Sequence, residues 1–393
     1  TPGIPRSSTW TRTASGPAPR SWPERSGCAR RSCRGQAGER RSGFGTPRCA
    51  ASPGTAEGER RLGELSLIEK IRGLLGPPGA GIIIGPGDDA AVLEPPAGLT
   101  VVTCDAFVED VHFRKGYASL SDIGWKCMVA NLSDIAAMGG FPAHAVVSVC
   151  VDPGSTEDDV LGLYRGLLGA ARSYGTEVVG GDVVSSTTGL VVSIALLGVV
   201  DPERIVTRRG AVPGDALVVT GELGGSDVGL MALRDGEGAV EDLAAAVDRH
   251  LRPKPRIAEA QALIDVATPH AMIDLSDGLT TDALHLAEES CVGIVVREET
   301  IPIAGCAATA ADRFGVSPAE LALASGEEFE LLVALPASEV DRSVEHVEAV
   351  TGTRLTRIGE IVESERGHIL IGKDGTEDAL RRTGYEHALG RER

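Results

Sequence analysis

Apolar residues recur along the chain with two periods, and together they predict helices alternating with short strands. Spacing of three and four residues predicts helices at 66–75, 121–138, 156–174, 226–233, 255–267 and 279–289. Short apolar runs predict strands at 82–84, 99–103, 145–151, 176–179, 190–199, 216–220, 271–274, 330–335 and 357–362. Between the two sets, residues 201–214 are rich in Pro, Gly and Arg, which predicts turns. The pattern predicts an α/β (α+β) protein with an N-terminal domain at 61–205 and a C-terminal α+β domain at 206–393.

Residues 1–60 have almost no periodic apolar pattern and are rich in Pro, Gly, Ser and Arg. They carry eleven Arg and four acidic residues, a charge of about +7, so the remainder carries about −25. We expect a disordered basic extension. A dispensable extension, or upstream sequence translated from a wrongly chosen start, is the favoured interpretation. A nucleic-acid arm and a transit peptide remain alternatives.

Charge and cysteine usage narrow the class of protein. The net charge of −18 argues against a nucleic-acid partner, which would favour a basic face. No apolar run reaches the roughly 18 residues that a membrane span needs, so we expect no membrane association. Five cysteines lie in apolar contexts without paired spacing, which predicts reduced thiols in a cytoplasmic protein: Cys104, Cys127, Cys150, Cys291 and Cys306.

Aspartates recur beside the predicted strands and helices, often next to glycine. A single such Asp is usually only a turn former. Repetition of the same arrangement instead favours one acidic pocket, built from Asp88, Asp89, Asp105, Asp134, Asp182, Asp274 and Asp277. Carboxylates at close range disfavour one another's ionisation, so such a pocket requires cations. Oxygen ligands without His or Cys suit Mg²⁺, Mn²⁺ or Ca²⁺, and Mg²⁺ usually binds together with substrate phosphates. The pocket therefore predicts a polyphosphate ligand.

Other candidate residues each allow two interpretations. The glycine-rich stretch 221–229 could cradle a phosphate or could be a structural turn, and no GxxxxGK[ST] motif occurs. Arg208 could pair with a phosphate or be solvated. His112 could pack or contact substrate, and Glu327 could lie in a solvated turn or face a cationic ring. No Ser-His-Asp or Cys-His arrangement stands out, so no covalent nucleophile is required.

Several of these segments together resemble the thiamine-monophosphate kinase family, over about residues 63–389. The resemblance rests on collinear motifs: Gly85-x-Gly-Asp-Asp-Ala-Ala-Val-Leu93, Thr103-x-Asp105, His112-Phe113, Asn131-Leu-Ser-Asp-x-Ala-Ala-Met-Gly139, Gly180-Gly-Asp182, Thr207-Arg208-x-Gly210, Ile273-Asp-Leu-Ser-Asp-Gly278, Gly326-Glu-x-x-Glu-Leu331 and Gly384-Tyr-Glu-His387. It implies the two-domain fold of the aminoimidazole ribonucleotide synthetase-like superfamily, with a mixed N-terminal sheet and helices. It also implies a homodimer whose N-terminal sheets join, and a nucleotide bound between the domains.

The resemblance implies direct in-line transfer of the ATP γ-phosphoryl group to thiamine monophosphate, with several Mg²⁺ ions and no phosphoenzyme. Carried over, the metal ligands would be Asp89, Thr103, Cys104 (through its carbonyl), Asp105, Asp134, Asp182, Asp274 and Asp277. ATP would contact Gly181, Asp182, Arg208 and Ser276, and thiamine monophosphate would contact His112, Glu327 and Tyr385.

This chain departs from the family pattern at two positions that bear on these expectations. Cys104 replaces a residue that is often a hydroxyl residue, and Ser325-Gly-Glu-Glu-Phe329 replaces Gly-Gly-Glu-Asp-Tyr, which bears on the shape of the thiamine pocket. The alternatives are another ATP-dependent enzyme of the superfamily, selenophosphate synthetase-like or hydrogenase-maturation-like, and a non-catalytic nucleotide- or metal-binding subunit.

Overall fold

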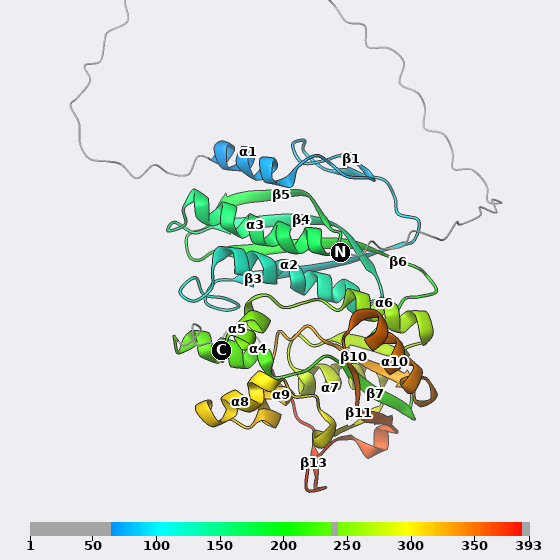
Figure 1. The fold of residues 1–393 in the computed structure, drawn as a ribbon. Helices are drawn as coiled ribbons and strands as arrows, with labels where there is room; N and C mark the ends of the chain where they lie inside the picture. The colour runs from blue at the N-terminus through cyan, green and yellow to red at the C-terminus, as the bar shows by residue number, and fades with distance from the viewer. Residues whose placement is uncertain (1–63, 237–242, 387–393) are drawn as a thin grey trace, which may run out of the picture. The chain divides into compact units, whose positions relative to one another are not determined.

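The computed structural model describes residues 64–236 and 243–386, and its helices and strands alternate as the apolar pattern predicts (Figure 1). The prediction for residues 1–60 lies outside the described residues. The described chain begins with α1 (Glu64–Leu75), followed by a small hairpin of β1 (Ile82–Ile84) and β2 (Val92–Leu93). None of the described helices is long and apolar enough to span a membrane.

A four-stranded mixed sheet forms the first half of the described chain, in the order β3-β6-β4-β5. Its strands are β3 (Leu99–Val108), β4 (Phe141–Val151), β5 (Glu177–Ser185) and β6 (Val191–Val200), of which only β4 and β5 pair in parallel. Helices α2 (Leu120–Ala137) and α3 (Glu157–Ser173) pack against each other and against this sheet (Figure 1). The side chain of Thr156 caps α3 in a capping box with Asp159, as a Thr-x-x-Asp start favours.

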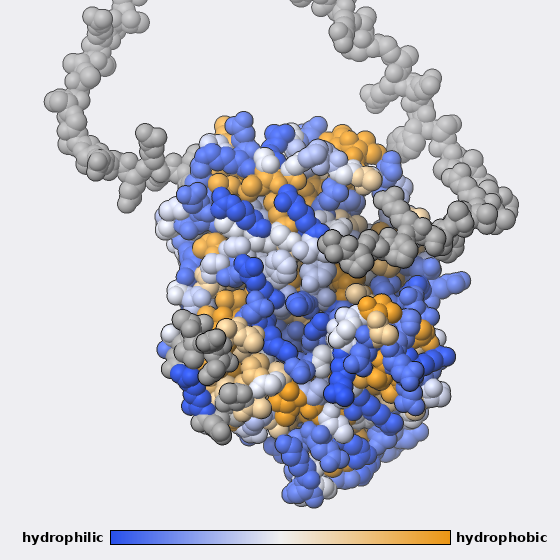
Figure 2. Space-filling view, in the orientation of Figure 1, coloured by the Kyte–Doolittle hydropathy of each residue, from blue (hydrophilic) through white to orange (hydrophobic). Residues whose placement is uncertain are grey.

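A seven-stranded sheet forms the second half, in the order β13-β12-β9-β11-β7-β10-β8. Its strands are β7 (Asp215–Thr220), β8 (Ala271–Asp274), β9 (Gly293–Arg297), β10 (Leu331–Pro336), β11 (Leu355–Val362), β12 (His368–Ile371) and β13 (Glu377–Ala379). All neighbours are antiparallel except β12 and β9. On the surface in Figure 2, hydrophilic residues cover the end of the molecule at β13, and an apolar patch lies over β1.

Helices cover both faces of the second sheet because its central strands are apolar on both sides. Leu217 and Val219 of β7 share a core with α7 (Leu279–Ser290), whereas Ala216 and Val218 share one with α6 (Ile257–Val266) and α10 (Val340–Thr351). The remaining helices are α4 (Gly225–Arg234), α5 (Ala244–Leu251), α8 (Gly305–Phe314) and α9 (Pro318–Ala324), with short 3₁₀ turns η2 (Glu298–Thr300), η3 (Ala337–Glu339) and η4 (Ser364–Arg366). The apolar pattern does not predict β2, α5, α8–α10, β9, β12 or β13.

Two predicted strand ends are wrong. β3 continues to Val108, so Asp105 lies within a strand rather than after one, and β5 likewise continues through Asp182 to Ser185. The physical reason is pairing, because β3 is hydrogen-bonded to β6 along its whole length and β5 to β4 over Glu177–Ser185. A partner strand thus holds polar and glycine residues extended where local propensity favours a break.

Candidate active site

A cavity of about 640 Å³ brings together residues from both halves of the described chain. Four predicted aspartates line it: Asp105 on β3, Asp134 on α2, Asp274 at the end of β8, and Asp277 three residues later. The α2 helix makes this possible, because it packs on the first sheet and also contacts β8 and α6. The cavity therefore contains four of the seven aspartates that the sequence predicts in one acidic pocket, and Asp88, Asp89 and Asp182 lie outside it.

Burial raises the pKa values of three aspartates in this acidic pocket, and repulsion from a neighbouring aspartate adds to the shift for two of them. Burial, followed by the negative charge of Asp134, raises the pKa of Asp105 to about 6. The same two causes raise the pKa of Asp274 to about 7. The pKa of Asp134 is also raised by burial, although the hydrogen bond from Thr103 and the charge of Arg208 oppose the shift. A bound cation would relieve this repulsion, so the electrostatics suit a cation site.

Polar side chains that the sequence analysis did not assign to the site hold the aspartates in place. Ser133 Oγ donates to Asp274 Oδ2 at 2.7 Å, which connects α2 directly to β8. Asn131 Oδ1 accepts from the backbone N–H of Asp105 at 3.2 Å, and the Thr103 hydroxyl donates to Asp134. The segment 131–134 thus places two supporting side chains beside Asp134, and the only signal in the sequence was their position in the Asn-Leu-Ser-Asp motif.

The turn that carries Ser276 and Asp277 is held by Asp282, another residue that sequence reasoning missed. Asp282 Oδ2 accepts from the backbone N–H groups of Asp277 and Gly278, each at 3.1 Å. Burial, followed by the charges of Asp274 and Asp277, raises the pKa of Asp282 to about 8. Its position four residues after Gly278, in the first turn of α7, is typical of a residue that stabilises a helix start.

The end of the described chain closes over the same turn. Tyr385 N–H donates to the carbonyl of Asp277 at 3.0 Å, and Tyr385 lines the cavity. Gly384 packs so closely that an added Cβ would lie 1.9 Å from the same carbonyl. Sterics therefore require glycine before Tyr385, since only glycine permits this approach.

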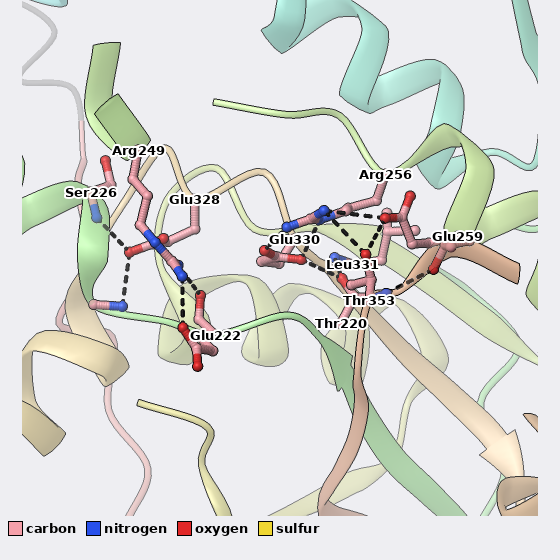
Figure 3. A network of polar contacts seen from close by, with 12 residues as sticks. Thr220, Glu222, Ser226, Arg249, Arg256, Glu259, Glu328, Glu330, Leu331 and Thr353 are labelled. Atoms are coloured by element: carbon pink, nitrogen blue, oxygen red, sulfur yellow. Dashed lines mark hydrogen bonds and ion pairs between the residues drawn. The ribbon is translucent and has the colours of Figure 1, made fainter. Parts of the chain in front are cut away.

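The segment 325–330 contains side chains that line the cavity and side chains that anchor the backbone, and Figure 3 shows the anchoring contacts of Glu328 and Glu330. Glu328 Oε1 accepts from the backbone N–H groups of Gly224 and Ser226 at 2.8 and 3.0 Å, and from the Ser325 hydroxyl. Glu330 forms an ion pair of 2.5 Å with Arg256 and accepts from Thr220 at 2.7 Å. Between these anchors, Glu327 and Phe329 line the cavity.

The backbone of these two cavity-lining residues is strained. Glu327 and Phe329 have φ values of 55° and 54°, which only glycine adopts readily. The anchors at Glu328 and Glu330 thus hold a conformation that costs energy locally, as is common at binding sites.

Aromatic and apolar residues line the part of the cavity around His112. The rings of Phe107 and His112 lie 5.3 Å apart, and His112 Nδ1 accepts from the backbone N–H of Val108 at 3.1 Å. That hydrogen bond places the proton of the neutral ring on Nε2. Tyr117 also lines the cavity, and Glu327 forms an ion pair with the buried Lys126. All three predicted substrate residues, His112, Glu327 and Tyr385, therefore line this cavity.

The other predicted residues lie elsewhere. Asp89, Gly181 and Asp182 line a second cavity of about 680 Å³ with Arg72 and Tyr164. For Asp182 the sheet register explains this separation: Asp105 pairs with Ile194, whereas Asp182 lies in register with Ser148 and Ser193, and adjacent residues of β6 face opposite sides. Arg208 is exposed and acts on Asp134 through its charge. Of the predicted ATP contacts, only Ser276 lines the first cavity. The predicted metal ligand Cys104 also lines it.

The donor set fits a hard cation only in part. Within residues 64–236 and 243–386, no group of three or more His, Cys, Asp or Glu side chains is arranged to hold a metal ion by itself. Mg²⁺ is usually held by one or two carboxylates together with phosphate oxygens and water, so the carboxylate donors of the cavity match that chemistry if a phosphate completes the ligands.

Comparison with known proteins places this fold in a class. Residues 87–200 match the family described as AIR synthase related protein, N-terminal domain, and residues 212–372 match its C-terminal domain. The two matches correspond to the halves built on the four-stranded and seven-stranded sheets, and they confirm the predicted fold class.

Individual relatives define the family more narrowly. The thiamine-monophosphate kinase of Bacillus subtilis is 35% identical over 311 residues, which cover 77% of this chain and 93% of that protein. A solved structure of the thiamine-monophosphate kinase from Stenotrophomonas maltophilia matches with a TM-score of 0.70 and 31% identity, covering 81% of this chain and 98% of that one. A structure of AaThiL complexed with AMPPCP and TMP matches with a TM-score of 0.66 and 32% identity, covering 85% and 100%. This chain belongs to the thiamine-monophosphate kinase family.

Proposed function

We propose that this chain catalyses the ATP-dependent phosphorylation of thiamine monophosphate to thiamine diphosphate. Its membership of the thiamine-monophosphate kinase family supports this activity, and so does the complex of a relative with AMPPCP and TMP. The observation that carries the proposal is a single cavity in which four aspartates lie beside an aromatic part containing His112 and Tyr385. The acidic part suits metal-bound phosphates, and the aromatic part suits the rings of thiamine.

The transfer proceeds in line from ATP to the substrate phosphate without a covalent enzyme intermediate. Asp105, Asp134, Asp274 and Asp277 would hold Mg²⁺, with Thr103, Asp89, Asp182 and the carbonyl of Cys104 as further predicted ligands. When bound, Mg²⁺ offsets the negative charge of the phosphates. The chain itself supplies position, because Ser133, Asn131 and Asp282 fix the aspartates and their backbone before substrate arrives.

The two substrates occupy different parts of the site. Thiamine monophosphate contacts His112, Glu327 and Tyr385 in the aromatic part. ATP contacts Ser276 and Arg208, and its predicted contacts Gly181 and Asp182 line the second cavity. The roles of these residues follow from the family motifs, and the positions of His112, Glu327, Tyr385 and Ser276 in one cavity support them.

The functional unit is a homodimer joined through the four-stranded sheets, and each chain divides near residue 205 into two domains. The loop between β6 and β7 supports that boundary, since residues 201–214 contain no helix or strand. Exposed apolar residues on the face of the first sheet that α2 and α3 do not cover, such as Val102 and Phe141, support the dimer. The enzyme works in the cytoplasm, and the absence of disulfides among its five described cysteines supports that location.

An assay of ADP release from ATP, with thiamine monophosphate and Mg²⁺, tests the activity. We expect turnover that depends on thiamine monophosphate, with thiamine diphosphate as the product. Asp105→Asn should lower kcat/KM by about 100-fold or more, because it removes a carboxylate that would hold the phosphate-bound Mg²⁺. Asp110→Asn is the matched control, since Asp110 is exposed and its φ of 66° is as compatible with Asn as with Asp. A wild-type protein that releases no ADP would favour a non-catalytic binding subunit, and near-normal turnover of Asp105→Asn would overturn the role of the acidic pocket.

A further inference from the structure

One carboxylate in the cavity belongs to none of the predicted groups. Asp227 lies in the first turn of α4 and lines the cavity together with Leu230 and Arg234 of the same helix. Residues three, four and seven apart share one helix face, so α4 presents this face to the cavity. Asp227 is therefore placed by the helix, not by a flexible loop.

Asp227 lies beside the segment 325–330, because its backbone N–H donates to Ser325 Oγ at 3.1 Å, two residues before Glu327. The charges that act on its carboxylate come from Glu327, Arg234 and Lys126. The charge that acts on Asp105 comes instead from Asp134, and the charges that act on Asp274 come from Asp134 and Asp105. The cavity thus contains two separate acidic groups, one for phosphates and one beside the aromatic side chains.

The two carboxylates of this second group differ in how they are compensated. Glu327 forms an ion pair with Lys126, whose side chain is only 5% exposed, and Lys126 Nζ lies 3.2 Å from His250 Nε2. A buried cation therefore already balances Glu327. Among the described residues, no hydrogen bond or ion pair reaches the carboxylate of Asp227, whereas its backbone N–H donates to Ser325 Oγ at 3.1 Å.

An unbalanced carboxylate in a largely buried setting is unfavourable unless a ligand pairs with it. Burial, followed by the charge of Glu327, raises the pKa of Asp227 to about 6, so the group is mostly ionised at neutral pH. Thiamine monophosphate carries a permanent positive charge on its thiazolium ring and an amino group on its pyrimidine ring. Both features favour a nearby carboxylate, and the aromatic walls suit the flat rings.

We propose that Asp227 is a specificity-determining residue that binds the cationic organic part of the substrate, supplying the negative charge that Glu327, paired with Lys126, does not. This inference rests on the proposed function, and it deepens that function by adding a contact from α4. It predicts discrimination between a cationic ring and an uncharged ring of the same shape.

The test compares thiamine monophosphate with an uncharged analogue in which thiophene replaces the thiazolium ring. Calorimetry measures the Kd of both ligands with wild type, Asp227→Asn and Asp227→Glu. We expect Asp227→Asn to lower the preference for the cationic ligand by about 10-fold, the effect of losing one charged contact. Asp227→Glu, which keeps the charge, should retain a preference within about 3-fold of wild type.

Asp235→Asn is the matched control, because it removes the same charge from the exposed C-terminal end of α4. It should leave the ligand preference unchanged. An unchanged preference in Asp227→Asn, with active wild type, would overturn this inference and leave the kinase activity intact. Absence of ADP release by the wild type would instead overturn the proposed function. If Asp227→Asn does not fold, Asp227→Glu decides the test. A preference for the cationic ligand that is lowered by about 10-fold in Asp227→Glu then contradicts the proposal.

Discussion

Single residues in this protein often have roles that depend on close backbone contacts. Gly384 lies against the carbonyl of Asp277, and the next residue, Tyr385, donates to that same carbonyl. Asp282 holds the other side of the turn through two backbone N–H groups. Ser276 and Asp277 are thus fixed from both sides, and a small change at Gly384 should be felt in the cavity.

Gly384→Ala should weaken the binding of thiamine monophosphate. The added Cβ would lie 1.9 Å from the carbonyl oxygen of Asp277, so the segment that carries Tyr385 must move away. We expect KM for thiamine monophosphate to rise about 10-fold while the melting temperature falls by only a few degrees. Steady-state kinetics measure the first and a thermal melt the second.

Gly73→Ala is the control for this substitution. An added Cβ at Gly73 meets nothing within 4 Å, and the residue lies in α1, where alanine favours the helix. KM should not change in this variant. A Gly384→Ala protein with wild-type KM would show that the end of the described chain does not position the substrate.

At the scale of elements, buried glutamates join the segment 325–330 to the elements around it (Figure 3). Glu328 reaches the start of α4, and Glu330 reaches Arg256 at the start of α6. Arg256 in turn contacts Glu259 at 3.1 Å, and Thr353 donates to the same Glu259. The strained backbone at Glu327 and Phe329 is therefore held by helices that belong to the scaffold.

Glu328→Gln should change how stability depends on pH. Burial raises the pKa of Glu328 to about 7 from an ordinary value of 4.5, so the folded state favours the protonated form. The wild type therefore loses stability as pH rises from 4.5 to 7, by up to about 1.4 kcal/mol for each pH unit. Glutamine keeps the acceptor oxygen and cannot ionise, so the variant should gain relative stability over this window.

Urea unfolding at pH 5 and pH 7.5 measures this effect. The unfolding free energy of Glu328→Gln minus that of wild type should be larger at pH 7.5 than at pH 5. Glu365→Gln, at an exposed position, should change stability by less than about 0.5 kcal/mol at both pH values. The same difference at both pH values for Glu328→Gln would contradict the raised pKa.

At the scale of the whole molecule, one face of the first sheet is covered by α2 and α3 and the other contains exposed apolar residues. The strand register places four large, exposed apolar residues on this second face: Val102, Phe141, Val146 and Val184. An exposed apolar sheet face of this kind is typical of a surface that another chain covers.

Val102→Lys should convert the proposed dimer into a monomer. Val102 is 62% exposed, so lysine can be accommodated in the isolated chain, but a joined sheet face would bury its charge. Light scattering after size exclusion measures the mass. Val350→Lys, at a position on α10 that is 60% exposed, should leave the mass unchanged. If Val102→Lys keeps the mass of a dimer, the dimer contact does not include this sheet face.

The sequence by itself determined the order of most helices and strands and the family. Local periodicity is enough to predict α3, because its apolar residues lie on a face that must be buried, and apolar residues at helical spacing also predict α2, which is buried on almost all sides. The collinear motifs around Asp105, Asp134 and Asp274 likewise predicted residues that line one cavity. These features depend on residues that are near one another in the chain.

The tertiary structure alone decided which residues meet. Strand pairing extends β3 and β5 through their aspartates and places Asp105 and Asp182 on opposite faces of one sheet. Packing of α2 against β8 brings Ser133 to Asp274, and the orientation of α4 adds Asp227 to the cavity. Such contacts join residues that are distant in the chain, 141 positions in the case of Ser133 and Asp274. Their free energy comes from burial and pairing that no local pattern contains.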